Sequence, residues 1–469
     1  MNASPSVERQ PSLIMSISCF IVMLVIIGVG KGIFNLPIQP LLICCAAYAA
    51  IVGYCHGFKW QDMEAGITKY LMESMPVMYI LISVGIVIGT WIYSGTVPMF
   101  IYYGLKLINP AAFLPLSFVI VAIVSVATGT AWGSTATAGV ALMGVAHQMG
   151  IPPAMACGAI IAGGVFGDKL SPLSDTTNLA ALVTRTPLFT HIRHMLWTTI
   201  PSSIIGLIIW GIAGLKFSGN ATAVDPTFSA HLEAIYNFNI ILLLPAVIII
   251  VGALLKYPTV PLMIISSVIA VILGILFHGL NLADGFTAAL SGFSLDMVPD
   301  NKLTFEDENI ASLLNRGGIN SMLNIITTIF CGYAFAGIVA KIGCLKVLLG
   351  VVEKNINKRW KLVGVTILGS LLLVFTAGVA SISIIMVGFL LKDAYTDLGL
   401  ASQNLSRTLE DAGTMWLPLV PWGASGIFYL EVLGVPTGSY FIWTIPCYLC
   451  IVFAMIYAVS GIAIKKIED

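Results

Sequence analysis

The feature that most constrains the fold is a long stretch without charge, because no Asp, Glu, Lys or Arg occurs between Leu107 and Gly167. A water-soluble domain carries about 25% charged residues, whereas this chain of 469 residues carries 9%. Apolar runs of about 20 residues, long enough to cross a bilayer as helices, recur along the sequence and suggest about ten to twelve spans. The clear runs cover 13–31, 38–55, 75–94, 194–216, 238–255, 259–278, 320–341 and 440–464. We therefore expect an all-α polytopic membrane protein whose surroundings are the lipid bilayer.

Two apolar stretches are interrupted by small and polar residues. The stretch 111–148 contains TGTAWGST at 128–135, and the stretch 151–183 contains GDKLSPLSDTTN at 167–178. Similar stretches follow at 362–391 and 402–433. We expect a re-entrant hairpin with its tip at 128–135 and a broken helix over 152–184, each with a counterpart in the second half.

The recurrence indicates an internal repeat. Pro37, Pro40 and Gly53 match Pro258, Pro261 and Gly274 at an offset of 221, and Asp62 matches Asp284 one residue later. Gly89 and Gly95 match Gly337 and Gly343 at an offset of 248. At an offset of 249 the matches are Gly129, Ser134, Gly139, Gly150, Gly164, Leu170 and Pro172 with Gly378, Ser383, Gly388, Gly399, Gly413, Leu419 and Pro421. We expect an N-terminal span over 1–36, a first repeat over 37–217, a linker span over 218–257, and a second repeat over 258–469 with an acidic outer loop near 285–318.

Lys and Arg set the expected orientation, because loops on the cytoplasmic side are enriched in them. With the two termini inside, sixteen of the 22 Lys and Arg residues fall in inner loops. Five fall outside, namely Lys31, Lys106, Lys216, Lys302 and Arg316. The same topology makes the two repeats opposite in orientation, an arrangement typical of transporters with their site near the middle of the membrane.

The two breaks of the first repeat are rich in oxygen atoms. Backbone groups freed by a broken helix must be satisfied inside the membrane, and Na+ is a hard cation that binds hydroxyl, carboxylate and carbonyl oxygens. We expect Na+, and no other metal, to be bound here. The predicted ion-binding residues are Asp168, Ser171, Ser174, Asp175, Thr176, Asn178, Thr130 and Ser134.

Acidic residues of the broken helices are candidates for proton coupling, since a buried carboxylate is costly to keep charged and can exchange a proton for a cation. The predicted residues are Glu410, Asp411 and Asp175. In the alternative interpretation one of these acids caps a helix, as Asp175 before Thr176 could, or pairs with Lys169 or Arg407.

Other polar and aromatic residues near the breaks are predicted to line a substrate pocket, although aromatic packing against glycine explains the tryptophans equally well. The predicted lining residues are Trp132, Thr376, Ser381, Ser383, Thr414, Trp416 and Trp422. His191 and His194 are interpreted as a solvated loop pair, with pH sensing as the alternative.

The motifs GDKLSPLSDTT at 167–177 and LED-x-GT at 409–414, followed by Pro418, Leu419, Pro421 and Trp422, resemble the NhaC-type Na+/H+ antiporter family. The resemblance covers about residues 12–465. It implies a bacterial inner-membrane secondary transporter of two inverted repeats, with an elevator-like motion of its hairpins and broken helices. Met415, Trp416 and Gly423 depart from the small polar residues and the Asn expected there, which makes the second site more apolar.

The leading hypothesis is a Na+/H+ antiporter that works by alternating access, with Na+ and H+ as its partners. The alternative on the same fold is a Na+- or H+-coupled carrier or exchanger of a small organic acid or amino acid. An intramembrane enzyme and a channel are less favoured, because His and Cys do not cluster around a nucleophile and repeats with acidic breaks favour alternating access. We expect no cofactor and no nucleic-acid partner, and the sequence leaves the oligomeric state open, with a homodimer among the options.

Overall fold

The computed structural model describes residues 11–34, 36–217, 226–255, 257–299, 308–344, 347 and 357–467. Within these ranges the regular elements are helices, apart from one isolated bridge between Leu400 and Lys466. The helices of the first half are α1 (Leu13–Gly32), α2 (Ile38–Cys55), α3 (Trp60–Tyr93), α4 (Thr96–Leu107), α5 (Phe113–Thr128), α6 (Ala131–Ser134), α7 (Val140–Gln148), α8 (Pro153–Leu170), α9 (Asp175–Val183) and α10 (Leu188–Leu215). Those of the second half are α11 (Pro226–Ile235), α12 (Leu244–Leu254), α13 (Thr259–His278), α14 (Leu282–Ser291), α15 (Glu308–Leu314), α16 (Ile319–Lys341), α18 (Arg359–Ala377), α19 (Ala380–Asp397), α20 (Ser402–Ala412), α21 (Ala424–Leu433), α22 (Thr437–Tyr440) and α23 (Ile445–Ser460).

Eight helices of the described chain are long and apolar enough to cross a bilayer, and bent helix pairs raise the candidate spans to as many as 11. One of these pairs is α8 with α9, which meet at 45° at the predicted break. In another pair, Phe228–Ile235 and Ile240–Leu254 meet at 91°. The chain turns at Asn239, whose side chain accepts a hydrogen bond from the N–H of Ile241, and the helical segment Ile240–Leu254 falls within the predicted span 238–255.

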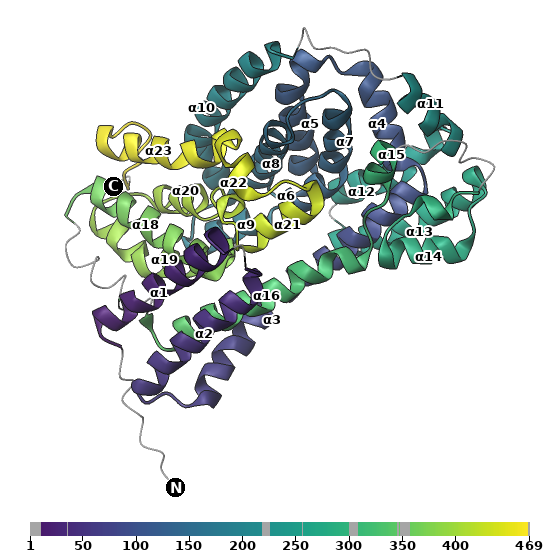
Figure 1. Cartoon of the computed structure of the whole chain (residues 1–469). Coiled ribbons are helices and arrows are strands. Elements are labelled where there is room, and N and C mark those ends of the chain that lie inside the picture. Colours follow the sequence, from purple (N-terminus) through teal and green to yellow (C-terminus); the bar gives the residue numbers. More distant parts are fainter. Residues whose placement is uncertain are drawn as a thin grey trace.

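The helices form two groups (Figure 1). Helices α2, α3, α13, α14 and α16 pack on one another along one side, and α5, α8, α9, α10, α18, α19, α20 and α23 pack on the other. The short elements α6 and α21 lie between these groups, in the middle of the molecule. The segments α6 and α21, which follow the turn after α5 and the break after α20, therefore lie inside the fold.

Backbone features recur at the spacing seen in the sequence. The helix ends at Gly95 and Gly343 have φ values of 79° and 83°, the turns at Gly129 and Gly378 have 70° and 71°, and those at Gly150 and Gly399 have 64° and 67°. A residue other than glycine rarely adopts such angles, so these six glycines fix equivalent turns in the two halves.

Helix crossings recur as well. Gly66 of α3 lies against Gly337 of α16, where a Cβ at Gly66 would be 2.6 Å from the carbonyl oxygen of Gly337. Gly89 of α3 lies against Ala288 of α14, with the corresponding distance at 2.0 Å. Gly66 pairs with Ala288 at the offset of 222 that pairs Asp62 with Asp284, and Gly89 pairs with Gly337 at the offset of 248. The two contacts therefore join positions that the predicted repeat makes equivalent.

Candidate functional site

A cavity of about 260 Å³ lies where the breaks of both halves meet. Its wall combines the turn after α5, the break between α8 and α9, the turn before α19, and the break between α20 and α21. Seven residues predicted from the sequence line it, namely Thr130, Trp132, Asp168, Asp175, Thr176, Ser381 and Thr414. The fold thus brings together residues that are up to 284 positions apart (Thr130 and Thr414).

Asp168 is the most deeply placed acid of the cavity wall. It lies in the last turn of α8, its side chain is 9% exposed, and its Oδ1 atom has no hydrogen-bond partner among the described residues. A buried carboxylate oxygen without a partner is costly unless a cation or water satisfies it. Asp168 is therefore placed as a ligand for a cation would be.

Asp175 and Thr176 begin α9 at the more open rim of the cavity. Ser174, rather than Asp175, is the N-cap of this helix, because its hydroxyl accepts a hydrogen bond from the N–H of Thr177. Asp175 Oδ1 accepts only from the N–H of Thr176, at 2.9 Å. Asp175 is also the first residue of α9, where the positive end of the helix dipole stabilises negative charge.

Three predicted ion-binding residues of this break hold its backbone and do not line the cavity. The hydroxyl of Ser171 donates to the carbonyl oxygen of Val126 at 2.7 Å, which ties the break to α5. Asn178 donates to the carbonyl oxygens of Pro172 and Ser174, and Ser174 caps α9. A direct contact of these side chains with the ion stays a prediction.

The turn after α5 contributes Thr130 and Trp132. Thr130 caps α6 through its hydroxyl, while Ser134 donates to the carbonyl oxygens of Thr130 and Ala131 and lies behind the wall. Trp132 donates from Nε1 to the hydroxyl of Ser425 at 2.9 Å, and its ring stacks on Phe428 with centroids 4.9 Å apart. This tryptophan therefore joins the turn of the first half to α21 of the second.

The second half supplies fewer of its predicted residues. Ser381 and Thr414 line the cavity, and Thr414 Oγ1 has no partner in the described chain. The hydroxyls of Thr376 and Ser383 donate to the carbonyl oxygens of Leu372 and Ser370, respectively. Trp422 donates to the carbonyl oxygen of Phe375, and Trp416 packs on Phe441. These last four residues lie outside the cavity wall, so their role in lining a pocket stays a prediction.

Glu410 and Asp411 are both fully buried, but their surroundings differ. Asp411 forms an ion pair with Lys169, accepts a hydrogen bond from Thr198 at 2.8 Å, and lies 4.0 Å from Arg407. Neither carboxylate oxygen of Glu410 has a hydrogen-bond partner within the described ranges. The pairing that the sequence left open thus applies to Asp411 and leaves Glu410 as the acid without a fixed counter-ion.

Sequence reasoning missed two residues of this region, Ser425 and Tyr429. Ser425 and Tyr429 line the cavity one helical turn apart on α21, and the hydroxyls of Thr135 and Tyr429 are buried without a partner in the described chain. The i,i+4 spacing of two polar residues in an apolar helix was the available signal. The sequence also placed His191 and His194 in a solvated loop, which is wrong, because both are buried in α10.

The charge of the cavity wall has one sign. Two carboxylates line it, and none of the described lining residues is Lys, Arg or His. In the low-dielectric interior of a membrane protein such a wall attracts cations and repels carboxylate anions.

Comparison with known proteins also indicates a transporter of cations, and the similarity extends over nearly the whole chain. Residues 10–177 and 163–462 match the sequence profile of the Na+/H+ antiporter family. The chain is 41% identical to an uncharacterized Na+/H+ antiporter of Haemophilus influenzae, with 98% of each chain covered. It is 34% identical to the malate-2H+/Na+-lactate antiporter of Bacillus subtilis, with 97% of this chain and 96% of the relative covered. It is also 34% identical to the Na+/H+ antiporter NhaC of Alkalihalophilus pseudofirmus, with 94% and 96% covered. The chain is therefore a multi-pass membrane transporter that belongs to the NhaC-type Na+/H+ antiporter family.

Proposed function

We propose that this transporter exchanges Na+ for H+ by alternating access. The observation that carries the proposal is the central cavity, where Asp168 presents an unpaired carboxylate oxygen between the turns and breaks of both halves. The family relationship supports secondary transport with Na+ and H+, and the cavity supplies a place for the cation.

Na+ binds Asp168 and Asp175, with further oxygens from Thr176 and Thr130, in this proposal. All four line the cavity, and hard monovalent cations favour such carboxylate and hydroxyl oxygens. Four side chains support these ligands from behind through the hydrogen bonds to backbone described above, namely Ser171, Ser174, Asn178 and Ser134. Their carbonyl oxygens complete the donor set when the cation is bound.

Glu410 carries the transported proton in this scheme, whereas Asp411 stays ionised. Asp411 is held by Lys169 and Thr198, and separating a buried ion pair is costly. Glu410 has no such partner and lies near Asp175, whose negative charge acts on it. Mutual repulsion of these two carboxylates links the loss of the proton to the arrival of the cation.

The architecture in this proposal is two inverted repeats, 37–217 and 258–469, preceded by a span at 1–36 and joined by the segment 218–257. The paired positive-φ glycines and the doubled helix crossing support the repeat. The distribution of Lys and Arg supports cytoplasmic termini in a bacterial inner membrane. Opposed repeats give two equivalent arrangements of one site, which is what alternating access requires.

A second candidate function is the exchange of a small organic substrate. A cavity of about 260 Å³ exceeds the space that a bare Na+ needs, Trp132 forms part of its wall, and a relative exchanges malate and lactate. The absence of a basic side chain among the described lining residues counts against a free carboxylate anion. It favours a cation, or an anion that enters together with Na+.

Purified protein in liposomes separates these functions. With pyranine inside and buffer free of metabolites outside, an imposed Na+ gradient should move H+ at once. Proton movement that appears only after an organic acid or amino acid is added would replace the antiporter with a metabolite carrier. In the antiporter, Glu410→Gln should flatten the pH dependence of Na+ transport, while Asp411→Asn should lower activity at every pH.

A further inference from the structure

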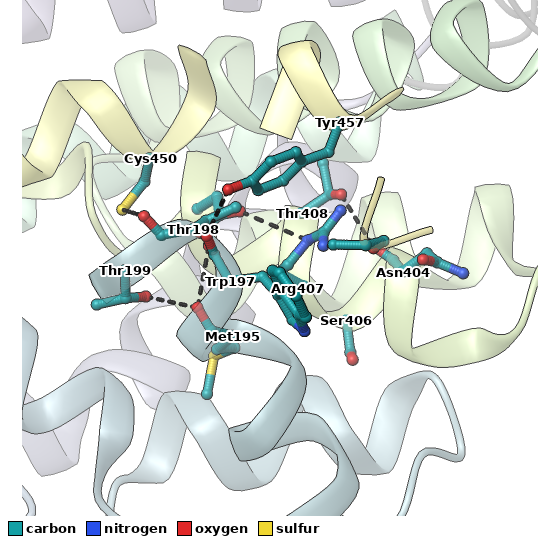
Figure 2. A network of polar contacts seen from close by, with 12 residues as sticks. Met195, Trp197, Thr198, Thr199, Asn404, Ser406, Arg407, Thr408, Cys450 and Tyr457 are labelled. Atoms are coloured by element: carbon teal, nitrogen blue, oxygen red, sulfur yellow. Dashed lines mark hydrogen bonds and ion pairs between the residues drawn. The ribbon is translucent and has the colours of Figure 1, made fainter. Parts of the chain in front are cut away.

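A second group of polar side chains lies buried behind the cavity, between α10, α20 and α23 (Figure 2). His191, Arg407 and Asp411 expose none of their surface, and His194 exposes 4%. In Figure 2, Arg407 of α20 lies beside Tyr457 of α23, and Cys450 of α23 lies next to Thr198 of α10. Polar groups at this depth in a membrane protein are expensive and are normally all paired.

Many of these polar atoms have no protein partner in the described part of the chain. They include both ring nitrogens of His191, Nε2 of His194, Nε and Nη2 of Arg407, and Oδ2 of Asp411. The 4.0 Å between Arg407 and Asp411 is too long for a hydrogen bond. Adjacent unpaired donors and acceptors are the usual signature of ordered water between them.

The group is continuous from one end of α20 to the cavity. At the outer end, Asn404 donates to the carbonyl oxygen of Lys465 at 2.6 Å, and Arg407 donates to that of Ala463 at 2.9 Å. His191, His194 and Thr198 follow one another at three- and four-residue spacing on α10 and so share one face of that helix. Thr198 donates to Asp411 at 2.8 Å, which places this face of α10 against α20. Lys169 in turn pairs with Asp411, and its charge also acts on Glu410.

The charges along this route balance. Lys169 of α8 and Arg407 of α20 are offset by Asp411 and Glu410, while His191 and His194 line it from α10 and Cys450 and Tyr457 from α23. Lys465 lies at the outer end, where its backbone N–H donates to the side chain of Asn404 at 3.0 Å. Because this group of side chains carries no excess positive charge, electrostatic repulsion does not keep a proton out of it.

We propose that His191, His194, Arg407 and Asp411 line a water-filled passage, distinct from the cation cavity, that leads from the end of α20 near Lys465 to Glu410 and carries the transported proton. The passage opens on the face that carries the C-terminus, which we assign to the cytoplasm. The identity of the transported proton rests on the proposed function, but the presence of water does not.

Hydroxyl-radical footprinting of the full-length protein in liposomes tests for the water. Radicals formed from bound water modify side chains that lie next to it, even where the side chain is buried. Cys450, His191 and His194 should be modified. Cys157 and His278 are matched controls. Both cysteines are buried, but Cys450 lies 3.9 Å from Lys169 Nζ and from the carbonyl oxygen of Thr198, whereas Cys157 makes no side-chain hydrogen bond in the described chain. Both ring nitrogens of His278 have partners. Labelling of Cys450 and the two histidines at the low level of these controls would show a dry group and overturn the proposal.

Transport of variants tests whether the water carries the proton. His194→Leu and His191→Phe replace polar walls with apolar ones and should slow Na+-driven H+ movement roughly tenfold, a typical cost of removing a proton-transfer route. Exchange of ²²Na+ for Na+, which needs no proton, should remain within about twofold of wild type. His194→Asn keeps a polar wall and should restore most of the H+ flux.

The two readouts also separate misfolding from a blocked passage. A variant that loses Na+/Na+ exchange has lost the fold or the cation site and says nothing of the passage. In that case the H+ flux of His194→Asn, which keeps a polar wall, is compared with that of wild type. Unchanged H+ flux in His194→Leu and His191→Phe, with Na+/Na+ exchange intact, would refute the passage. If the wild-type protein is labelled at Cys450 but moves no H+ under a Na+ gradient, the proposed function is contradicted. The presence of water in the passage would then stand, and its role in proton transport would not.

Discussion

At the scale of single residues, Asp168 is the side chain on which cation binding depends most in this structure. It is the buried carboxylate of the cavity wall, with an unpaired oxygen among the described residues. Asp168→Asn keeps the size of the side chain and removes its charge, so apparent Na+ affinity should fall by about tenfold or more. The Na+ concentration dependence of H+ movement in liposomes measures this. Asp296→Asn, at an exposed position outside the spans, is the control, and wild-type Na+ affinity in Asp168→Asn would rule out this ligand.

Lys169 and Asp411 form an ion pair that joins α8 of the first half to α20 of the second. Lys169→Met leaves the carboxylate of Asp411 buried with only Thr198 and a distant Arg407, which should cost about 3–5 kcal/mol of stability. The double variant Lys169→Met with Asp411→Leu removes both charges and should recover much of that loss. Thermal unfolding in detergent measures the stability of both variants. If the double variant were as unstable as Lys169→Met, the interaction between the two side chains would contribute nothing to stability.

At the scale of elements, the crossing of α3 with α14 depends on the absence of a side chain at Gly89. A Cβ there would lie 2.0 Å from the carbonyl oxygen of Ala288, which is backbone and cannot turn aside. Gly89→Ala should therefore cost more than about 2 kcal/mol through displaced helices. Gly211→Ala in α10 meets nothing within 4 Å and should be neutral or stabilising, since Ala favours helix. Melting temperatures of both variants in one detergent give the comparison, and a stable Gly89→Ala would mean that the helices are farther apart than described.

The repeat makes a related prediction for the turns. Gly129 and Gly378 occupy equivalent left-handed positions, but a Cβ at Gly129 would lie 2.7 Å from Leu173, whereas the nearest atom to one at Gly378 is 3.2 Å away. Both alanine variants should lose about 1–2 kcal/mol to the backbone conformation, with a further loss in Gly129→Ala from the clash at the cavity. Thermal stability and Na+ affinity of the two variants should therefore diverge, and equal values would indicate that the first turn has room to relax.

At the scale of the whole molecule, the proposed topology predicts which loops face each side of the membrane. In a variant without the nine native cysteines, Asp296→Cys should react with an impermeant thiol reagent from the periplasmic side. Asp397→Cys, at the end of α19, should react only from the cytoplasmic side. Both positions are exposed, so unequal reactivity reports sidedness and not burial. The reverse pattern would overturn the orientation, and reaction of both from one side would overturn the predicted number of membrane crossings between the two positions.

The amino-acid sequence by itself determined the class of the fold and the location of its breaks. Low charge and apolar runs of bilayer length leave few alternatives to helical spans, because lipid satisfies no backbone hydrogen bonds. Glycines that adopt left-handed angles and prolines that lack an N–H mark turns locally, so Gly129, Gly378 and the break after Leu170 could be placed from the chain alone. The motifs at 167–177 and 409–414 likewise indicate the family without any knowledge of tertiary contacts.

Only the tertiary structure decided which polar side chain serves which purpose. Ser171, Ser174 and Asn178 look like ligands in the sequence, yet they satisfy the backbone of the break that they occupy. Glu410 and Asp411 are adjacent and chemically alike, but only Asp411 meets Lys169 and Thr198. Whether a buried oxygen is paired depends on groups as many as 242 positions away (Lys169 and Asp411), brought together by helix packing. No local pattern in the sequence contains that information, because adjacent residues of a helix point in different directions and meet different partners.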